Sequence, residues 1–356
     1  MKSILFLLFI LLNSAIYTFA QDNFRVVFYN LENLFDTIDN PEKEDDEFLP
    51  QSNRRWTQSR YQNKIDNLGR VLALAGEDKT PFLVGLCEIE NEKVLEDLIA
   101  SQSELTQLNY GYIISDCEDR RGINTALLYK KDKLNYIAHH FYRPILPANP
   151  EKKTRDILHF SGEFISKDTI DVFVIHFPSR REGKKKTQPD RVAVADLLKD
   201  KTDSVIKIRE NANILIMGDF NEEPSAVCIH EALNAGPIPD FPDKQFLYNL
   251  FYPIENIKDV GSYKYRKQWN IPDQIIVSGN LISGNESLKI LPGTASVLQF
   301  DFMLTEDKTH GGKRPWKTFH GYIYEGGFSD HLPLIVDFVI TDLQNSEVKS
   351  LGNSSN

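Results

Sequence analysis

The stretch of residues 214–221, which reads I-L-I-M-G-D-F-N, constrains the fold more than any other part of the sequence. Its four large apolar residues, 214–217, are typical of a strand buried on both faces, and Gly218 is expected to end that strand. Asp219 and Asn221 follow at i, i+2 spacing, so both side chains point to the same side of a strand end. The stretch therefore predicts a catalytic strand end. The alternative is a β-turn in which Asp219 and Asn221 bond their own backbone.

Residues 1–20 have the pattern of a secretory signal peptide. Lys2 precedes an apolar run over 4–12, and the segment closes on small and apolar residues up to Ala20, before polar residues begin. This pattern predicts cleavage after Ala20 and a secreted or periplasmic protein. A first helix that is buried or anchored in a membrane is the alternative, but the run is shorter than the ~20 residues that a span requires. We expect no stable membrane anchor.

Composition sets wider bounds on the remainder. The 356-residue chain is 41% apolar, which is enough to bury a large core. We expect one large domain over residues 21–340 and a polar tail over 341–356. The chain has three cysteines, an odd number without ligand-like spacing, so disulfides are not expected to hold the fold. With a formal net charge of −10, the protein lacks the overall positive field that draws nucleic acids to a surface.

Strands and helices alternate along the chain. Apolar residues at helix spacing predict a helix over 60–75, and Asn91 is expected to cap a helix over 92–101. A long helix is expected over 189–208, and Ser225 is expected to cap a short one. Strands are predicted at 24–29, 82–87, 112–114, 125–129, 134–142, 157–165, 170–177, 214–217, 273–277 and 334–340. This order predicts a layered α/β architecture.

Polar side chains gather at the ends of these strands. The set combines carboxylates, amides and two imidazoles: Asn30, Glu32, Glu88, His176, Asp219, Asn221, Asp273, Asp330 and His331. Taken singly, a His on an apolar strand is more often a satisfied core residue, and an Asp is more often a cap or turn. Together, oxygen ligands of this kind suit a hard divalent cation such as Mg²⁺. A cation beside imidazoles indicates chemistry on a phosphate ester.

Six short motifs contain these residues, and the ordered set resembles a known superfamily. The motifs are Y-N-L-E-N-L-F-D from Tyr29, L-C-E-I-E-N from Leu86, H-F-P-S from His176, G-D-F-N from Gly218, D-Q-I from Asp273 and S-D-H from Ser329. They resemble, in the same order, those of the endonuclease/exonuclease/phosphatase superfamily, which includes pancreatic-type deoxyribonuclease, apurinic endonucleases and neutral sphingomyelinases. The resemblance implies an α/β (α+β) fold of the deoxyribonuclease-I type. This is a four-layer sandwich in which two mixed β-sheets pack face to face with helices outside, and the active site lies at one edge.

The resemblance also implies a metal site. Glu88 is expected to be the principal ligand of Mg²⁺, or of Mn²⁺ or Ca²⁺ in its place. Asn30 and Glu32 are expected in or beside the metal shell, with Asp330 close by. Glu32 stands where the apurinic branch has an aspartate, so the longer side chain leaves its ligation open.

Five further residues take catalytic roles by the same resemblance. Asp219 is expected to orient or deprotonate the attacking water, and Asn221 to bind water or a phosphate oxygen. His331, oriented by Asp273, is expected to contact the scissile phosphate. His176 is expected to stabilise or protonate the leaving group.

The implied activity is metal-dependent hydrolysis of phosphate esters by an exported monomer. We expect a phosphodiesterase or endonuclease acting on nucleic acid, DNA or RNA, or on nucleotides. Cations in loops beside the motifs form either a rim for phosphates or ordinary solvated charge; they are Arg120, Arg121, Arg180, Arg181 and the lysines at 184–186. Tyr263, Tyr265 and Trp269 either stack on a base or belong to the core. The alternatives are a phosphatase or phospholipase-like enzyme acting on small molecules or lipid head groups, and a catalytically silent binding protein on the same scaffold.

Overall fold

The computed structural model describes residues 22–76, 78–164, 167–284 and 288–340, so the expected signal peptide and polar tail lie outside the described residues. Two large sheets dominate this part of the chain. The first contains, in spatial order, β14 (Leu288–Ile290), β20 (Leu334–Ile340), β1 (Asp22–Leu34), β2 (Pro81–Ile89), β4 (Asn124–Lys130) and β3 (Tyr110–Ile114), with β15 (Ser296–Val297) beside β20. The second contains β5 (Leu134–Tyr142), β6 (Ile157–Phe164), β7 (Thr169–His176), β8 (Ile214–Asp219), β13 (Asp273–Ser278), β10 (Leu247–Asn249) and β9 (Ala235–Gly236).

Helices and small hairpins complete the structure. The helices are α1 (Gln58–Ala75), α2 (Glu92–Ala100), α3 (Ser103–Gln107), α4 (Lys184–Ile208) and α5 (Asn280–Ser283). Single 3-10 turns occur at Asp46–Phe48, Tyr252–Ile254 and Asp301–Met303, and a π turn at Cys228–Ala232. The hairpins pair β11 (Tyr263–Tyr265) with β12 (Gln268–Asn270), β16 (Leu304–Glu306) with β17 (Lys313–Pro315), and β18 (Phe319–His320) with β19 (Ile323–Tyr324). None of the helices in these described ranges is long and apolar enough to cross a membrane.

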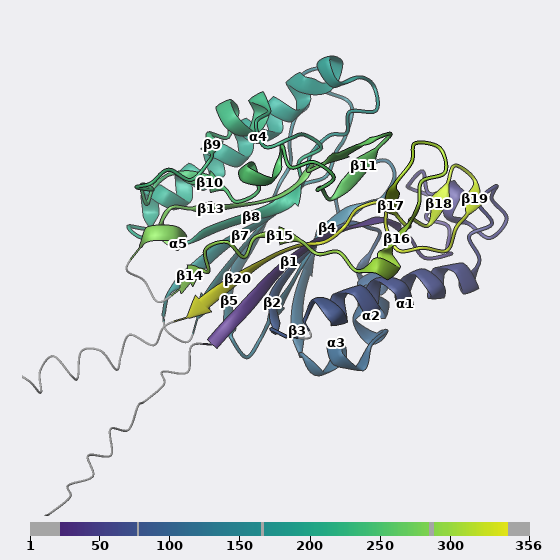
Figure 1. Cartoon of the computed structure of the whole chain (residues 1–356), viewed down its shortest axis with the longest axis horizontal. Coiled ribbons are helices and arrows are strands. Elements are labelled where there is room, and N and C mark those ends of the chain that lie inside the picture. Colours follow the sequence, from purple (N-terminus) through teal and green to yellow (C-terminus); the bar gives the residue numbers. More distant parts are fainter. Residues whose placement is uncertain (1–21, 77, 165–166, 285–287, 341–356) are drawn as a thin grey trace, which may run out of the picture.

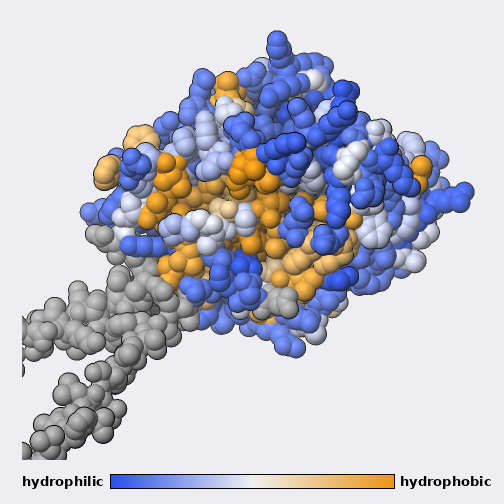
Figure 2. All heavy atoms as spheres, viewed as in Figure 1, coloured by the Kyte–Doolittle hydropathy of each residue, from blue (hydrophilic) through white to orange (hydrophobic). Residues whose placement is uncertain are grey.

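The two sheets pack face to face between outer layers of helix (Figure 1). A central core combines side chains from both sheets, such as Phe28 and Leu127 from the first and Leu158 and Met217 from the second. The helices α1 and α2 cover the outer face of the first sheet, and α4 covers that of the second. Figure 2 shows hydrophobic residues in a band through the middle of the molecule, between outer layers that are largely hydrophilic. The expected four-layer α/β sandwich is confirmed.

Parallel pairing within each sheet brings strand ends together. β1 runs parallel to β2 in the first sheet, and β7 runs parallel to β8 in the second, whereas β13 is antiparallel to β8. The carboxyl ends of parallel neighbours meet at one edge of a sheet. The start of β13 therefore lies beside the ends of β7 and β8.

Two glycines permit close backbone approach in the centre of the sandwich. A Cβ atom on Gly85 of β2 would lie 2.6 Å from Sδ of Met217, across the space between the sheets. A Cβ atom on Gly218 would lie 2.2 Å from the carbonyl oxygen of Ile175 in β7. The prediction that Gly218 ends its strand is wrong, because β8 continues to Asp219. Gly218 lies inside the strand, where it allows β7 and β8 to pair.

Two helix predictions are also wrong. Helix α4 begins at Lys184, not at residue 189, so part of the expected basic loop is helical and Pro189 lies inside the helix. Gly183, with φ of 108°, precedes its first residue, and the Gly183 carbonyl accepts the Thr187 N–H at 3.1 Å. Ser225 caps no helix, because both its N–H and its hydroxyl donate to the Glu255 carboxylate.

Other local predictions are confirmed. The side chain of Asn91 accepts the Val94 N–H at 2.9 Å and so caps α2. Cys87, Cys117 and Cys228 are all buried free thiols, so no disulfide joins them.

Candidate active site

The predicted strand-end residues converge where the two sheets meet. His176, Asp219 and Asp273 are neighbours across three adjacent strands of the second sheet, because Asp219 pairs in register with both of the others. The first sheet contributes residues of β1 and β2 and the segment that leads into β20: Asn30, Glu32, Glu88, Asp330 and His331. The site therefore lies at the seam between the two sheets.

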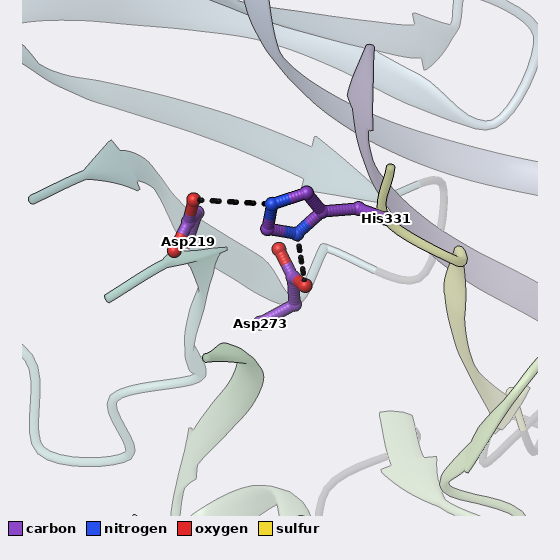
Figure 3. Close-up of side chains that lie close together, drawn as sticks. All are labelled: Asp219, Asp273 and His331. Atoms are coloured by element: carbon purple, nitrogen blue, oxygen red, sulfur yellow. Dashed lines mark hydrogen bonds and ion pairs between the residues drawn. The ribbon is translucent and has the colours of Figure 1, made fainter. Parts of the chain in front are cut away.

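His331 forms the tightest contact in this group. Its Nδ1 lies 2.7 Å from Oδ2 of Asp273, and its Nε2 lies 4.0 Å from Oδ2 of Asp219, so the ring stands between two aspartates (Figure 3). Burial disfavours the charged ring, but the charges of Asp273, Asp219 and Asp330 outweigh that effect and raise the pKa of His331 well above its usual range. The imidazole is therefore a cation at neutral pH, and Asp273 fixes its orientation.

Asp219 is buried at the end of β8 and makes two hydrogen bonds. Its Oδ1 accepts the backbone N–H of Asn221 at 2.8 Å, and its Oδ2 accepts the Asn30 amide at 3.1 Å. Burial, reinforced by the nearby charge of Asp273, raises the pKa of Asp219 to about 7. A carboxylate with this pKa can accept a proton near neutral pH.

His176 at the end of β7 is a neutral imidazole. Its Nε2 lies 3.6 Å from Oδ2 of Asp219 and 3.7 Å from Oε1 of Glu88, and its Nδ1 is buried without a hydrogen-bond partner. Burial and the positive charges of Arg155 and Arg121 lower the pKa of His176 well below its usual range. The two histidines of the site therefore differ in charge.

Asn221 closes the junction between β7 and β8. Its backbone is left-handed, with φ of 53°, and its side-chain amide donates to the carbonyl of Phe177 at 3.1 Å. The Asn221 N–H is bonded to Asp219, as in the turn that was the alternative for this stretch, but the Asn221 side chain bonds Phe177 on another segment rather than its own turn. Asp219 and Asn221 lie in the candidate site as well, so forming the turn does not exclude a role in the site.

Arg155 is a site residue that the sequence did not single out. It is buried, and it donates from Nε to the His176 carbonyl at 3.2 Å and from Nη2 to the Phe177 carbonyl. Its Nη1 lies 3.1 Å from Oδ2 of Asp119, which supplies the balancing charge. Its place in the basic loop over residues 152–155, two residues before β6, was the one available signal. Arg155 holds the end of β7 and so positions His176.

Glu88 and Glu32 occupy strained backbone positions on the first-sheet side. Glu88, Glu32 and Asn33 all have left-handed φ angles, of 61°, 51° and 52°. Oε2 of Glu88 accepts the Asn33 N–H at 2.9 Å, which leaves Oε1 beside His176. Oε2 of Glu32 accepts the Thr318 N–H at 2.7 Å. Both ends of the Asn30 side chain are bonded too, since its Oδ1 accepts the Glu32 N–H at 3.0 Å and its amide donates to Asp219.

Two sets of side chains are candidates to hold a divalent cation, and within the described residues only the first forms a compact ligand group. Asp219, Asp273 and His331 each offer an atom within 4.8 Å of the others. A metal would have to displace a proton from His331, whose raised pKa favours the proton. On the other side, the buried ammonium of Lys64 interacts with the negative charges of Glu32, Asp330 and Glu88. This second set supplies carboxylate oxygens, the donors that a hard cation such as Mg²⁺ prefers, while burial raises the pKa of Glu32 to about 7 against the effect of Lys64.

Several of the loop cations and aromatic residues have structural partners. Arg120 pairs with Glu44, and Lys184 lies 3.0 Å from Oε2 of Glu222. Tyr263 packs on the His331 ring, with ring centroids 4.9 Å apart and planes inclined at 35°. Trp269 packs against the core beneath the first sheet, whereas Tyr265 is exposed.

Comparison with known proteins identifies the family of the chain. Residues 25–339 match the model of a family described as "Endonuclease/Exonuclease/phosphatase family". The chain belongs to this family. It is therefore an enzyme of the phosphoesterase class, as the resemblance of its motifs implied. No curated protein sequence matches the chain.

Solved structures share the family fold at low sequence identity. A family protein from Bacteroides thetaiotaomicron is 17% identical with a TM-score of 0.54, over 90% of this chain and 98% of that one. The human Nocturnin catalytic domain with bound sulfate is 16% identical with a TM-score of 0.51, over 91% and 96%. A mannosyl-6-phosphatase from Bacteroides thetaiotaomicron VPI-5482 is 16% identical with a TM-score of 0.54, over 89% and 100%. These likenesses support the fold.

Proposed function

We propose that this family member is an exported, Mg²⁺-dependent hydrolase that cleaves phosphodiesters of nucleic acid or nucleotides. The observation that carries the proposal is the 4.0 Å separation between Nε2 of His331 and Oδ2 of Asp219. It places a carboxylate that can accept a proton opposite an imidazolium that can donate one. When the surroundings shift the pKa values of two neighbouring groups apart, one group can act as base and the other as acid. Here these are Asp219 and His331.

Asp219 acts as the general base in this scheme. Its pKa of about 7 lets it take a proton from water as the water oxygen forms a bond to phosphorus. His331 donates a charged hydrogen bond to a phosphoryl oxygen, and Asp273 keeps the ring in the required orientation. Placement of these groups, rather than a covalent nucleophile, then lowers the barrier.

His176 donates a hydrogen bond to the leaving oxygen while the bond between phosphorus and that oxygen breaks, and the departing alkoxide then takes its proton from solvent. Because the ring is neutral, it contributes a hydrogen bond rather than a positive charge. Asn221 and Arg155 hold the Phe177 carbonyl from two sides, which fixes the strand end that carries His176. We assign both residues to positioning.

We assign the metal site to Glu88 and Asp330, with Asn30 and Glu32 beside them. Oε1 of Glu88 and the partly exposed Asp330 carboxylate are the oxygen donors that the hydrogen bonds described above leave available. When bound, Mg²⁺, or Mn²⁺ or Ca²⁺ in its place, would offset the charge on the phosphoryl oxygens as a Lewis acid.

Hydrolysis assays test the proposal. The chain, expressed with its own leader and purified, is incubated with plasmid DNA, RNA, bis-p-nitrophenyl phosphate, p-nitrophenyl phosphate and a choline phospholipid, with Mg²⁺ or with EDTA. We expect diester cleavage that stops in EDTA and in the Glu88→Gln and His331→Ala variants. Failure of the folded protein to cleave any of these substrates would contradict the proposal and favour a binding protein on the same scaffold.

A second candidate is a phosphatase that acts on a small phosphate monoester. Two observations favour it: the likeness to a solved mannosyl-6-phosphatase, and the ion pairs that engage Arg120 and Lys184 at the rim. With a net charge of −10, the protein also has little overall attraction for a polyanion. Turnover of the monoester without diester cleavage would decide for this candidate.

Export and oligomeric state complete the proposal. We expect secretion into the periplasm or the medium after cleavage behind Ala20, on the pattern of residues 1–20. Amino-terminal sequencing of the protein made with its own leader tests this, and a retained Met1 would refute it. We expect a monomer, which light scattering on the purified protein measures.

A further inference from the structure

Lys64 is a buried cation for which the proposed chemistry has no role. Its side chain, on α1, is 1% exposed, yet lysine is almost never buried without a specific partner. Its ammonium donates to the backbone carbonyl of Glu32 and, at 2.7 Å, to the hydroxyl of Thr318. Its Nζ also lies 3.6 Å from Oε2 of Glu32. The ammonium is thus held by one peptide carbonyl, one hydroxyl and one carboxylate.

The carbonyl that Lys64 binds belongs to the same peptide group as the Asn33 N–H. That N–H donates to Oε2 of Glu88 at 2.9 Å. A trans peptide is planar, with its C=O and N–H pointing in opposite directions, so the ammonium and the carboxylate lie on opposite sides of one rigid unit. A positive charge on the carbonyl also strengthens the N–H as a donor.

This peptide group joins two residues with strained backbones. Glu32 and Asn33 have φ angles of 51° and 52°, a region that residues other than glycine occupy only when their surroundings hold them there. Lys64 contacts the carbonyl between them, and the Glu88 carboxylate contacts the N–H. The two contacts together hold the Glu32–Asn33 backbone in this conformation.

We propose that Lys64 is a positioning residue for the metal site, which aims the Glu88 carboxylate through the Glu32–Asn33 peptide group, and that Glu32 is the counter-ion of Lys64 rather than a metal ligand. The inference rests on the proposed function, because it assumes that Glu88 binds the cation. Partners that orient a metal ligand through hydrogen bonds typically change metal affinity by ~10–100-fold when removed.

The geometry of Glu32 supports the second half of the proposal. Its Oε2 accepts the Thr318 N–H at 2.7 Å and faces the ammonium of Lys64. Its backbone N–H donates to Oδ1 of Asn30 at 3.0 Å. The residue is therefore held by groups of β1, of α1 and of the segment just before β18.

Metal titration tests the proposal directly. Mg²⁺ binding to the purified protein, and Mn²⁺ binding in parallel, is measured by calorimetry without substrate, and folding is checked by circular dichroism. The pair Lys64→Met with Glu32→Gln removes both buried charges together, which avoids leaving either one unpaired. We expect this double variant to bind Mg²⁺ ~10–100-fold more weakly than the wild type.

Two variants serve as matched controls. Thr318→Val removes the hydroxyl that Lys64 binds but keeps the Glu32 carbonyl contact, so it should lower thermal stability and leave Mg²⁺ affinity close to that of the wild type. Glu32→Gln alone should also leave Mg²⁺ affinity close to wild type. Because glutamine has nearly the shape of glutamate, this variant tests the assignment of Glu32 even where the double variant fails to fold. In that case Lys64→Gln, which removes the charge that binds the Glu32 carbonyl, tests Lys64 and should also weaken Mg²⁺ binding.

Three results would overturn the proposal. Unchanged Mg²⁺ affinity in the folded double variant would leave Lys64 with a structural role alone. A loss of affinity in Glu32→Gln as large as that in Glu88→Gln would make Glu32 a ligand. No binding of Mg²⁺ or Mn²⁺ by the wild type would refute the metal role in the proposed function itself, and this inference with it.

Discussion

Replacing Gly218 with alanine tests the close pairing of β7 and β8. The new Cβ atom would lie 2.2 Å from the carbonyl oxygen of Ile175. Ordinary contacts begin near ~3.5 Å, so the two strands must separate by about 1 Å. The adjacent hydrogen bond from the Phe177 N–H to the Asp219 carbonyl, now 2.8 Å, would then exceed bonding distance.

The cost can be estimated from these two effects. Overpacking a tight interior position costs ~1–3 kcal/mol, and the lost hydrogen bond adds ~1 kcal/mol. We therefore expect Gly218→Ala to lower the free energy of unfolding by about 2–4 kcal/mol. Because Asp219 and His176 lie at the ends of the displaced strands, we also expect a fall in kcat.

Guanidinium unfolding and hydrolysis assays measure both effects. Gly236→Ala is the matched control, because the nearest atom to its Cβ would be His230 Cε1 at 3.5 Å, an ordinary contact. The reasoning is refuted if Gly218→Ala matches Gly236→Ala in both stability and turnover.

Three further predictions follow from other contacts. Arg155→Met should lower the free energy of unfolding by about 3 kcal/mol, since it breaks the buried ion pair with Asp119 and removes the donors to the His176 and Phe177 carbonyls. Arg121 remains 3.5 Å from Asp119, so adding Asp119→Asn should recover only part of the stability and none of the turnover. Burial raises the pKa of Asp307, but hydrogen bonds from the His310 N–H and Lys264 outweigh it and lower the pKa to about 2. Its stabilisation, at most about 2 kcal/mol, is therefore present above pH ~4 and lost as pH falls toward 2, and acid unfolding of Asp307→Asn should lack this component. Mg²⁺ at 100 times its Kd should raise the free energy of unfolding by about 2.7 kcal/mol, and Glu88→Gln should abolish the gain in thermal melts.

The architecture could be predicted because strands buried on both faces are readable as short apolar runs. Residues at their ends, such as Asp219 and His176, share an edge as soon as the strands are parallel neighbours, which the alternation with helices indicates. The chemistry of the side chains then suggested a phosphoesterase site. The metal and catalytic roles assigned to individual residues remain predictions.

What the sequence could not supply are contacts between distant segments and the packing role of single residues. Lys64 meets Thr318 across most of the chain, and nothing in the helical spacing of α1 distinguishes a buried ammonium from an exposed one. Gly218 has the local signature of a strand end, yet its role is set by Ile175 on the neighbouring strand. The start of α4 was misplaced for a related reason, since Pro189 resembles a first helical residue when its tertiary context is unknown.

Because the site lies at the seam between the two sheets, the catalytic rate depends on the distance between the sheets. Glu88 lies in β2 of the first sheet and His331 in the segment that leads into β20, whereas Asp219 and His176 lie in the second sheet. Gly85 and Met217 set how closely the sheets approach in the interior. A core substitution that thickens the sandwich by a fraction of an ångström changes the distance between acid and base without touching either. The turnover rate is therefore expected to change with the volume of the core side chains. As such a chain diverges, a change in side-chain size on one sheet must be matched by an opposite change on the other sheet for the activity to persist.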